Sequence, residues 1–220
     1  MSETIDYKTI QELAQNMESC FSFNPDDSKN AYLTWRMRNG DTSGRFKMLS
    51  GGYLEIAQKE IKELLVDNSA RQADIYIFPI LFDLVHGIEL GLKSLNYRLR
   101  HIVGEQDANI SCGGHKIQKI STDTKKLFFR FEKLKKLNVE QPITATKLIC
   151  NFINNIYKHT DNMSFARYPL DSHGKDMFYI KDDKIIVIDL DMLQAQVKYV
   201  IRMLDFLDEF IDRTTEDYSR

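Results

Sequence analysis

Apolar residues recur every three or four positions along most of this chain, the spacing that gathers them on one face of an α-helix. The segment 192–211 is a clear example, with Val197, Val200, Ile201 and Leu204 set between polar residues. We predict helices over seven segments with this pattern: 5–21, a short one ending near 35, 45–66, 76–103, 116–137, 143–159 and 192–211. They indicate a mainly α fold, a bundle of six or seven helices around one core.

The pattern changes between residues 164 and 189. Three short runs there, 164–168, 176–180 and 184–188, contain aromatic or β-branched residues and are separated by turn-forming sequences. We therefore predict a small β-hairpin insertion near residues 164–189. The whole chain, 1–220, is expected to form a single domain with four parts: an N-terminal helical extension (1–44), core helices (45–163), the hairpin (164–189) and a C-terminal helix (190–220).

Composition is typical of a globular protein. The chain has 220 residues, of which 43% are hydrophobic and 28% charged, with a net charge of −2. This content is too apolar for a disordered chain. Cys20, Cys112 and Cys150 form no CxxC pair and leave an odd thiol, which favours a reducing compartment. Because the N-terminal residues do not follow the pattern of a signal peptide, we expect a cytoplasmic protein.

The most apolar window, 76–95, is long enough to span a bilayer. It also contains Asp83, His86, Glu89 and Lys93, and each of these side chains is costly at membrane depth. We therefore interpret the window as a buried core helix and expect no membrane association.

Polar residues on this central helix form one stripe. At about 100° per residue, His86, Glu89, Lys93 and Arg100 fall within an arc of roughly 60°. Two interpretations are open: the side chains pair with one another and fix helix packing, or they face a polar cleft with a titratable histidine. The spacing does not match a zinc-binding HExxH motif, so we expect no metal and no other cofactor.

Four segments of the chain follow one another in an order that resembles HEPN-like helical proteins of bacteria. The stretch His86-Gly87-Ile88-Glu89-Leu90-Gly91-Leu92-Lys93, after an apolar lead-in from Phe78, is similar to RHxxELxLK, although Val85 stands in place of the arginine. Gly114-His115-Lys116-Ile117 resembles GHxL, and Arg167-Tyr168-Pro169 resembles an RYP segment near the end of such proteins. The upstream segment 52–57 also fits. The resemblance covers about 51–211.

This resemblance implies an activity on RNA. HEPN ribonucleases are similar helical domains, usually dimeric, that cleave RNA without metal through an Rx4-6H motif. Arg167 and His173 match that spacing. The resemblance thus implies a homodimeric, metal-independent endoribonuclease or RNA-binding component of a bacterial toxin–antitoxin or antiviral (phage-defence) system. Arg167 would clamp phosphate, and His173 or His86 would transfer protons.

Other arrangements of these residues are open. Pro169 prevents a helix across the Arg167–His173 segment, so Arg167 could instead anchor the hairpin to a carboxylate while His173 lies in a solvated turn. A further possibility is that the central-helix residues His86, Glu89 and Lys93 converge with His115 and Arg167 into one polar pocket.

Basic residues gather between His115 and Lys147. Nine of them outnumber three acidic residues, which gives a local charge of +6 and leaves −8 for the rest of the chain. Four share one helix face and could bind an RNA backbone: Lys119, Lys126, Arg130 and Lys133. Alternatively, this is a solvated helix face, or it recruits a partner protein to a non-catalytic helical interaction module.

Overall fold

The structure is a computed structural model that describes residues 20–33, 35–38, 41–105, 117–160, 163–181 and 185–216. The chain separates into two compact units, Met1–Asn39 and Gly40–Arg220. In the first unit, the described residues form a 3-10 helix, η1 (Asp27–Lys29), which Asp26 caps by accepting a hydrogen bond from the Ser28 backbone N–H, and a short helix, α2 (Trp35–Arg38). The helix predicted over 5–21 lies almost entirely outside the described residues.

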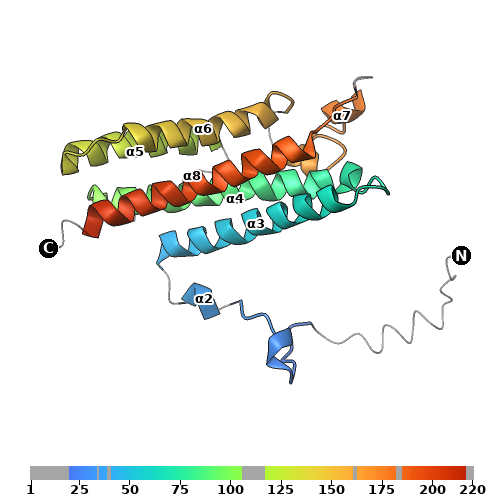
Figure 1. The fold of residues 1–220 in the computed structure, drawn as a ribbon, viewed down its shortest axis with the longest axis horizontal. Helices are drawn as coiled ribbons and strands as arrows, with labels where there is room; N and C mark the ends of the chain where they lie inside the picture. Colours follow the sequence, from blue (N-terminus) through green and yellow to red (C-terminus); the bar gives the residue numbers. More distant parts are fainter. Residues whose placement is uncertain are drawn as a thin grey trace, which may run out of the picture. The chain divides into compact units, whose positions relative to one another are not determined.

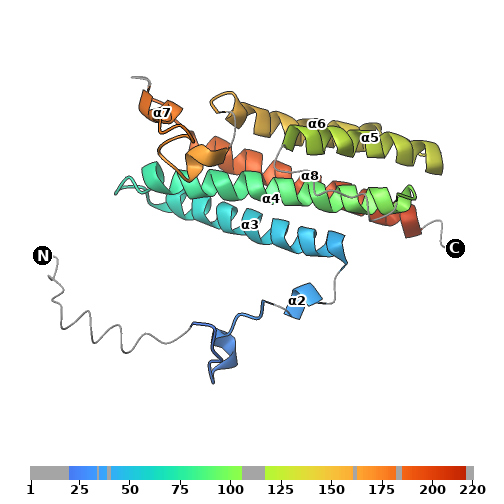
Figure 2. The ribbon, with the colours of Figure 1, turned by 180° about the vertical axis from the view of Figure 1, so that it is seen from behind.

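Five long helices make up most of the described part of the second unit. They are α3 (Thr42–Val66), α4 (Ala73–Ile102), α5 (Ile117–Lys135), α6 (Glu140–Tyr157) and α8 (Leu190–Glu216). Figures 1 and 2 show them running lengthwise beside one another. Each covers a segment that the hydrophobic spacing predicts as a helix, so the mainly α fold is confirmed.

Helix α4 is the centre of this bundle, in contact with α3, α5 and α8. Between Ile80 and Leu99 its side chains are buried nearly all round, as its continuous apolar sequence predicts. By length and composition α4 could also cross a membrane, and half of its most apolar window is buried inside the protein. The charged residues of its stripe are thereby held inside or at the edge of the core.

Small residues let α3 and α4 approach closely. A Cβ added at Gly87 would lie 2.8 Å from Leu54 Cγ, so glycine is required there. Two hydroxyls join the helices across this contact: Ser50 Oγ donates to the Gly87 carbonyl oxygen (2.7 Å), and Ser94 Oγ donates to the Ser43 carbonyl oxygen (2.8 Å). These contacts fix the relative position of the two helices.

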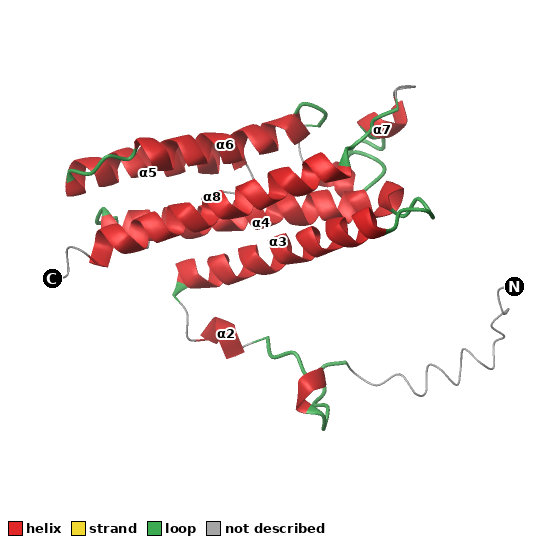
Figure 3. Cartoon of the chain, in the orientation of Figure 1, coloured by secondary structure: helices red, strands yellow, loops and turns green. Residues whose placement is uncertain are grey.

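The predicted β-hairpin near residues 164–189 is wrong for the part of it that the structure describes. Its first run lies on a 3-10 helix, η3 (Met163–Ala166), and its second ends in a short helix, α7 (Phe178–Lys181). Residues 185–189 belong to no helix or strand, and the only bridge among the described residues of this region is an isolated one between Leu170 and Asp176. Figure 3 accordingly draws no strand.

Aromatic packing explains this difference. The ring of Phe165 packs edge-on against that of Phe178 at 5.3 Å, and Tyr179 lies 5.0 Å from Phe78 of α4. These side chains gather on one side of the chain against α4, whereas a strand would alternate them between two faces. Tertiary packing therefore overrides the β propensity of these residues.

Candidate functional site

The polar stripe of α4 divides into an inner part and an outer part. In the inner part, Lys93 Nζ donates to Glu89 Oε1 at 2.6 Å, one turn apart on the helix. These residues are only 9% and 5% exposed. Burial raises the pKa of the Tyr157 hydroxyl, and the charge of Glu89 adds to this rise. Glu89 and Lys93 thus form a buried ion pair within the packing of the bundle, as the first interpretation of the stripe expects.

The C-terminal end of the stripe is also neutralised. Arg100 pairs with Glu105, and the same carboxylate pairs with Arg130 of α5. Burial acts to raise the pKa of Glu105, but the hydrogen bonds and charges of Arg130 and Arg100 outweigh it, so the pKa is lowered. Glu105 therefore holds α4 and α5 together through two arginines.

His86 occupies the outer part of the stripe, where it is half-buried among aromatic rings. Its imidazole stacks on Phe82, with 5.6 Å between ring centroids, and meets Tyr53 of α3 edge-on at 4.7 Å. The half-buried carboxyl of Asp83 lies one helical turn before His86. Burial raises the pKa of Asp83, and the charge of His86 opposes this rise. Two ionisable side chains thus lie half-buried side by side in the N-terminal half of α4.

Arg167 follows η3 and reaches the same place from another part of the chain. Its exposed guanidinium lies over the Phe82 ring, 5.3 Å from the centroid, and over the Tyr168 ring at the same distance. Within the described residues it has no carboxylate partner. Aromatic rings hold this cation in the part of the chain that the structure describes, in place of the predicted carboxylate anchor.

We call the group formed by Tyr53, Phe82, Asp83, His86 and Arg167 the Phe82 cluster. In this cluster the Phe82 ring lies between His86 and Arg167. The sequence predicts His86 and Arg167 as site residues, but it does not predict Phe82 as one. Phe82 and Asp83 lie four and three residues before His86, so helical spacing could have revealed them. Tyr53 comes from a different helix, and only the packing of α3 on α4 brings it there.

The remaining predicted histidines do not join this cluster in the described structure. His173 is exposed in a turn where the Asp171 carboxylate accepts hydrogen bonds from the backbone N–H groups of His173 and Lys175, at 2.8 and 2.9 Å. No described contact links His173 to Arg167 or His86, so the solvated-turn interpretation fits. His115 lies outside the described residues.

The predicted basic face is present on α5, but one of its four members is already bound to a carboxylate. Lys119, Lys126 and Lys133 are exposed. Arg130 is exposed as well, yet it is bound to Glu105. Three lysines therefore carry most of the available positive charge on this face.

The Phe82 cluster combines groups suited to phosphate chemistry. An imidazole can accept or donate a proton near neutral pH, and a guanidinium offers several donors to phosphate oxygens. No group of three or more histidine, cysteine, aspartate or glutamate residues in the described ranges is arranged to hold a metal ion.

No protein-family model, no curated protein and no solved structure matches this chain. The resemblance to HEPN-like proteins therefore stays a prediction based on its motifs.

Proposed function

We propose that this protein is a HEPN-like protein directed at RNA, and that it is a metal-independent endoribonuclease with the Phe82 cluster as its reactive site. The observation that carries the proposal is that Arg167 and His86, which lie far apart in the sequence, contact the same ring. An exposed cation that has no acidic partner among the described residues, beside a half-buried imidazole, is an arrangement suited to a phosphodiester.

In this proposal Arg167 binds the non-bridging oxygens of the scissile phosphate and stabilises their developing charge. The ribose 2′-oxygen attacks phosphorus and loses its proton, while the bond to the 5′-oxygen breaks and that oxygen gains a proton. His86 transfers one of these protons. Phe82 positions both groups. The exposed lysines of α5, Lys119, Lys126 and Lys133, would bind further phosphates of the same strand.

The direct test is cleavage of a generic single-stranded RNA in EDTA. We expect His86→Gln and Arg167→Ala each to lower the cleavage rate by roughly 100-fold, the typical range for a proton-transfer group or a charge-stabilising donor. His173→Ala is the matched control, because this exposed histidine contacts no member of the cluster, and it should cleave at the wild-type rate. Circular dichroism would verify that each variant is folded. Equal rates in the wild type and His86→Gln would reject the site.

A second candidate is a non-catalytic helical module that binds a partner protein, and one observation favours it. Residues 185–188, with the sequence Ile-Ile-Val-Ile, belong to no helix or strand and are exposed, Ile185 by 89% and Val187 by 81%. Such a segment is suited to pairing with another chain, either a partner protein or a second copy in a homodimer. Complete absence of RNA cleavage by the wild type, together with a smaller assembly for Val187→Lys in light scattering, would favour this candidate.

The cellular setting in our proposal is the bacterial cytoplasm, within a toxin–antitoxin or phage-defence system. It rests on the resemblance of the motifs alone.

A further inference from the structure

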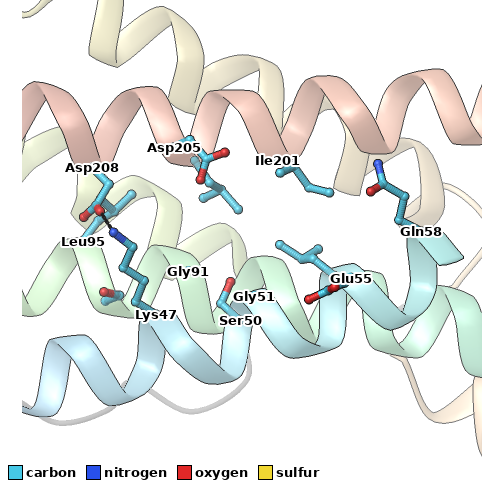
Figure 4. Close-up of a pocket in the computed structure, with 13 residues that line it drawn as sticks. Lys47, Ser50, Gly51, Glu55, Gln58, Gly91, Leu95, Ile201, Asp205 and Asp208 are labelled. Atoms are coloured by element: carbon cyan, nitrogen blue, oxygen red, sulfur yellow. Dashed lines mark hydrogen bonds and ion pairs between the residues drawn. The ribbon is translucent and has the colours of Figure 1, made fainter. Parts of the chain in front are cut away.

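A groove runs between α3, α4 and α8, and no residue of the Phe82 cluster lines it (Figure 4). Its volume is about 360 Å³, within the range of sites for small organic ligands. Apolar side chains from all three helices form its floor: Leu54, Leu95, Ile201 and Leu204. Polar groups line its walls, and three of the four charged ones are acidic: Glu55, Asp205 and Asp208.

Two of the wall carboxylates have no bonded partner among the described residues. Glu55 on α3 and Asp205 on α8 lie on opposite sides of the groove (Figure 4), and both are exposed. Neither makes a hydrogen bond or ion pair with any residue that the structure describes. Lys47, the cation of the groove, is instead paired with Asp208, which also binds Arg98.

The groove is therefore electrostatically negative. Burial raises the pKa of Asp205; nearby Lys47 opposes this rise, while Asp208 and Glu209 add to it. A positively charged ligand between Glu55 and Asp205 would relieve this repulsion.

Gly51 keeps the groove open. It lies inside α3, where glycine destabilises a helix relative to alanine, and a Cβ added there meets nothing within 4 Å. Packing explains Gly91, since a Cβ there would lie 3.0 Å from Ser50 Oγ. No packing contact with a described residue explains Gly51, which lines the groove on α3, one helical turn before Glu55. Any larger side chain at this position would extend into the space that a ligand needs.

The lining favours an organic cation over a metal ion. Metal ions require converging ligands, and the described residues hold no group of three that could supply them. The apolar floor, in contrast, matches the methylene chain of an aliphatic amine. We propose that this groove binds a linear organic polyamine, with its ammonium groups held by Glu55 and Asp205 and its carbon chain lying over Leu54 and Leu204. This inference is independent of the proposed activity on RNA.

Isothermal titration of the full-length protein with spermidine tests the proposal. We expect saturable binding, which Glu55→Gln and Asp205→Asn each weaken about tenfold, since each removes one charge-assisted contact. Asp74→Asn, at an exposed carboxylate that does not line the groove, should bind as the wild type does.

The sharpest comparison is between adjacent glycines of α3. Gly51→Leu would fill the groove and should abolish binding. Gly52→Leu places the same side chain one residue along, outside the groove and equally free of contacts, and should leave binding unchanged. Absence of saturable binding to the folded wild type would overturn the proposal. Binding that survives in Gly51→Leu, or magnesium chloride titrations with the same dependence on Glu55 and Asp205, would overturn it too.

Discussion

The guanidinium of Arg167 and the imidazole of His86 contact the same ring, that of Phe82. Arg167 follows a 3-10 helix late in the chain, whereas His86 and Phe82 lie one turn apart on the central helix. This relationship replaces the expected pairing of Arg167 with His173. It also moves the candidate reactive site from a turn to the N-terminal half of α4.

Replacement of the shared ring should uncouple the two groups. A cation–π contact at an exposed site contributes about 0.5–1 kcal/mol, so we expect Phe82→Leu to lower kcat/KM for RNA by roughly two- to fivefold. The fall should be smaller than that of His86→Gln. Phe206→Leu, which removes a partly exposed ring of α8 outside the cluster, is the control. A rate unchanged by Phe82→Leu would show that the ring does not position either group.

Breaking the buried ion pair should strongly destabilise the bundle. In Glu89→Ala the Lys93 ammonium loses its partner inside the core, and we expect unfolding to become easier by about 3–5 kcal/mol. Lys59 and Glu63 provide a matched control, because they form a pair with the same spacing at 3.8 Å but are 71% and 61% exposed. Glu63→Ala should cost roughly 0.5 kcal/mol or less. Urea denaturation followed by circular dichroism measures the free energy of unfolding of both variants. Similar losses in Glu89→Ala and Glu63→Ala would contradict the structural role of the Glu89–Lys93 pair.

Two glycines should respond oppositely to alanine. In Gly87→Ala the new Cβ would lie 2.8 Å from Leu54 Cγ, so α3 and α4 must separate; we expect a loss of about 1–3 kcal/mol. In Gly52→Ala the Cβ meets no atom within 4 Å, and the better helix former should stabilise α3 by about 0.5–1 kcal/mol. The melting temperature should therefore fall in Gly87→Ala and rise in Gly52→Ala. A shift of the same sign in both would argue against the close α3–α4 contact.

The carboxyl groups of Asp83 and Glu105 should make the stability of the protein depend on pH in opposite directions. Because the pKa of Asp83 is raised in the folded state, its ionisation opposes folding, and the penalty grows as pH rises through the folded pKa. Asp83→Asn should therefore stabilise the protein at neutral pH and lose this advantage at acid pH. The pKa of Glu105 is lowered, so its contribution is present above its ordinary pKa and is lost as pH falls through the folded value.

Glu105→Gln should accordingly destabilise the protein at neutral pH and have little effect in acid. Urea denaturation of both variants between acid and neutral pH measures these differences. A stability difference that stays constant with pH in either variant would contradict the corresponding assignment.

The lysines of α5 should govern the salt dependence of RNA binding. Each phosphate contact with a single strand contributes about 0.7 to the slope of log affinity against log salt, so Lys126→Ala should reduce the slope by about that amount. Arg130→Ala should reduce it less, because Glu105 already neutralises that guanidinium. Fluorescence anisotropy across a salt series would measure the slopes. Equal slopes in the wild type and Lys126→Ala would exclude that lysine from the interface.

The helices of the bundle could be predicted from the sequence because their signal is local. Long runs with a period near 3.6 residues leave one arrangement in which the apolar face is buried, and each of the five long helices was recognisable in this way. The hairpin prediction failed for a related reason: the short runs around Phe165 and Tyr179 carry little periodic information, and their rings pack against α4 instead.

By itself, the sequence determined that this is a mainly α protein with a polar stripe on its most apolar helix. It also determined that Glu89 and Lys93 could pair, since residues four apart on a helix are neighbours. Only the tertiary structure decided that this pair is buried while His86 lies near the surface with Arg167, and that Glu55 and Asp205 line one groove. Those relationships join different helices, and helical periodicity fixes which face a side chain occupies but not which helix lies opposite it.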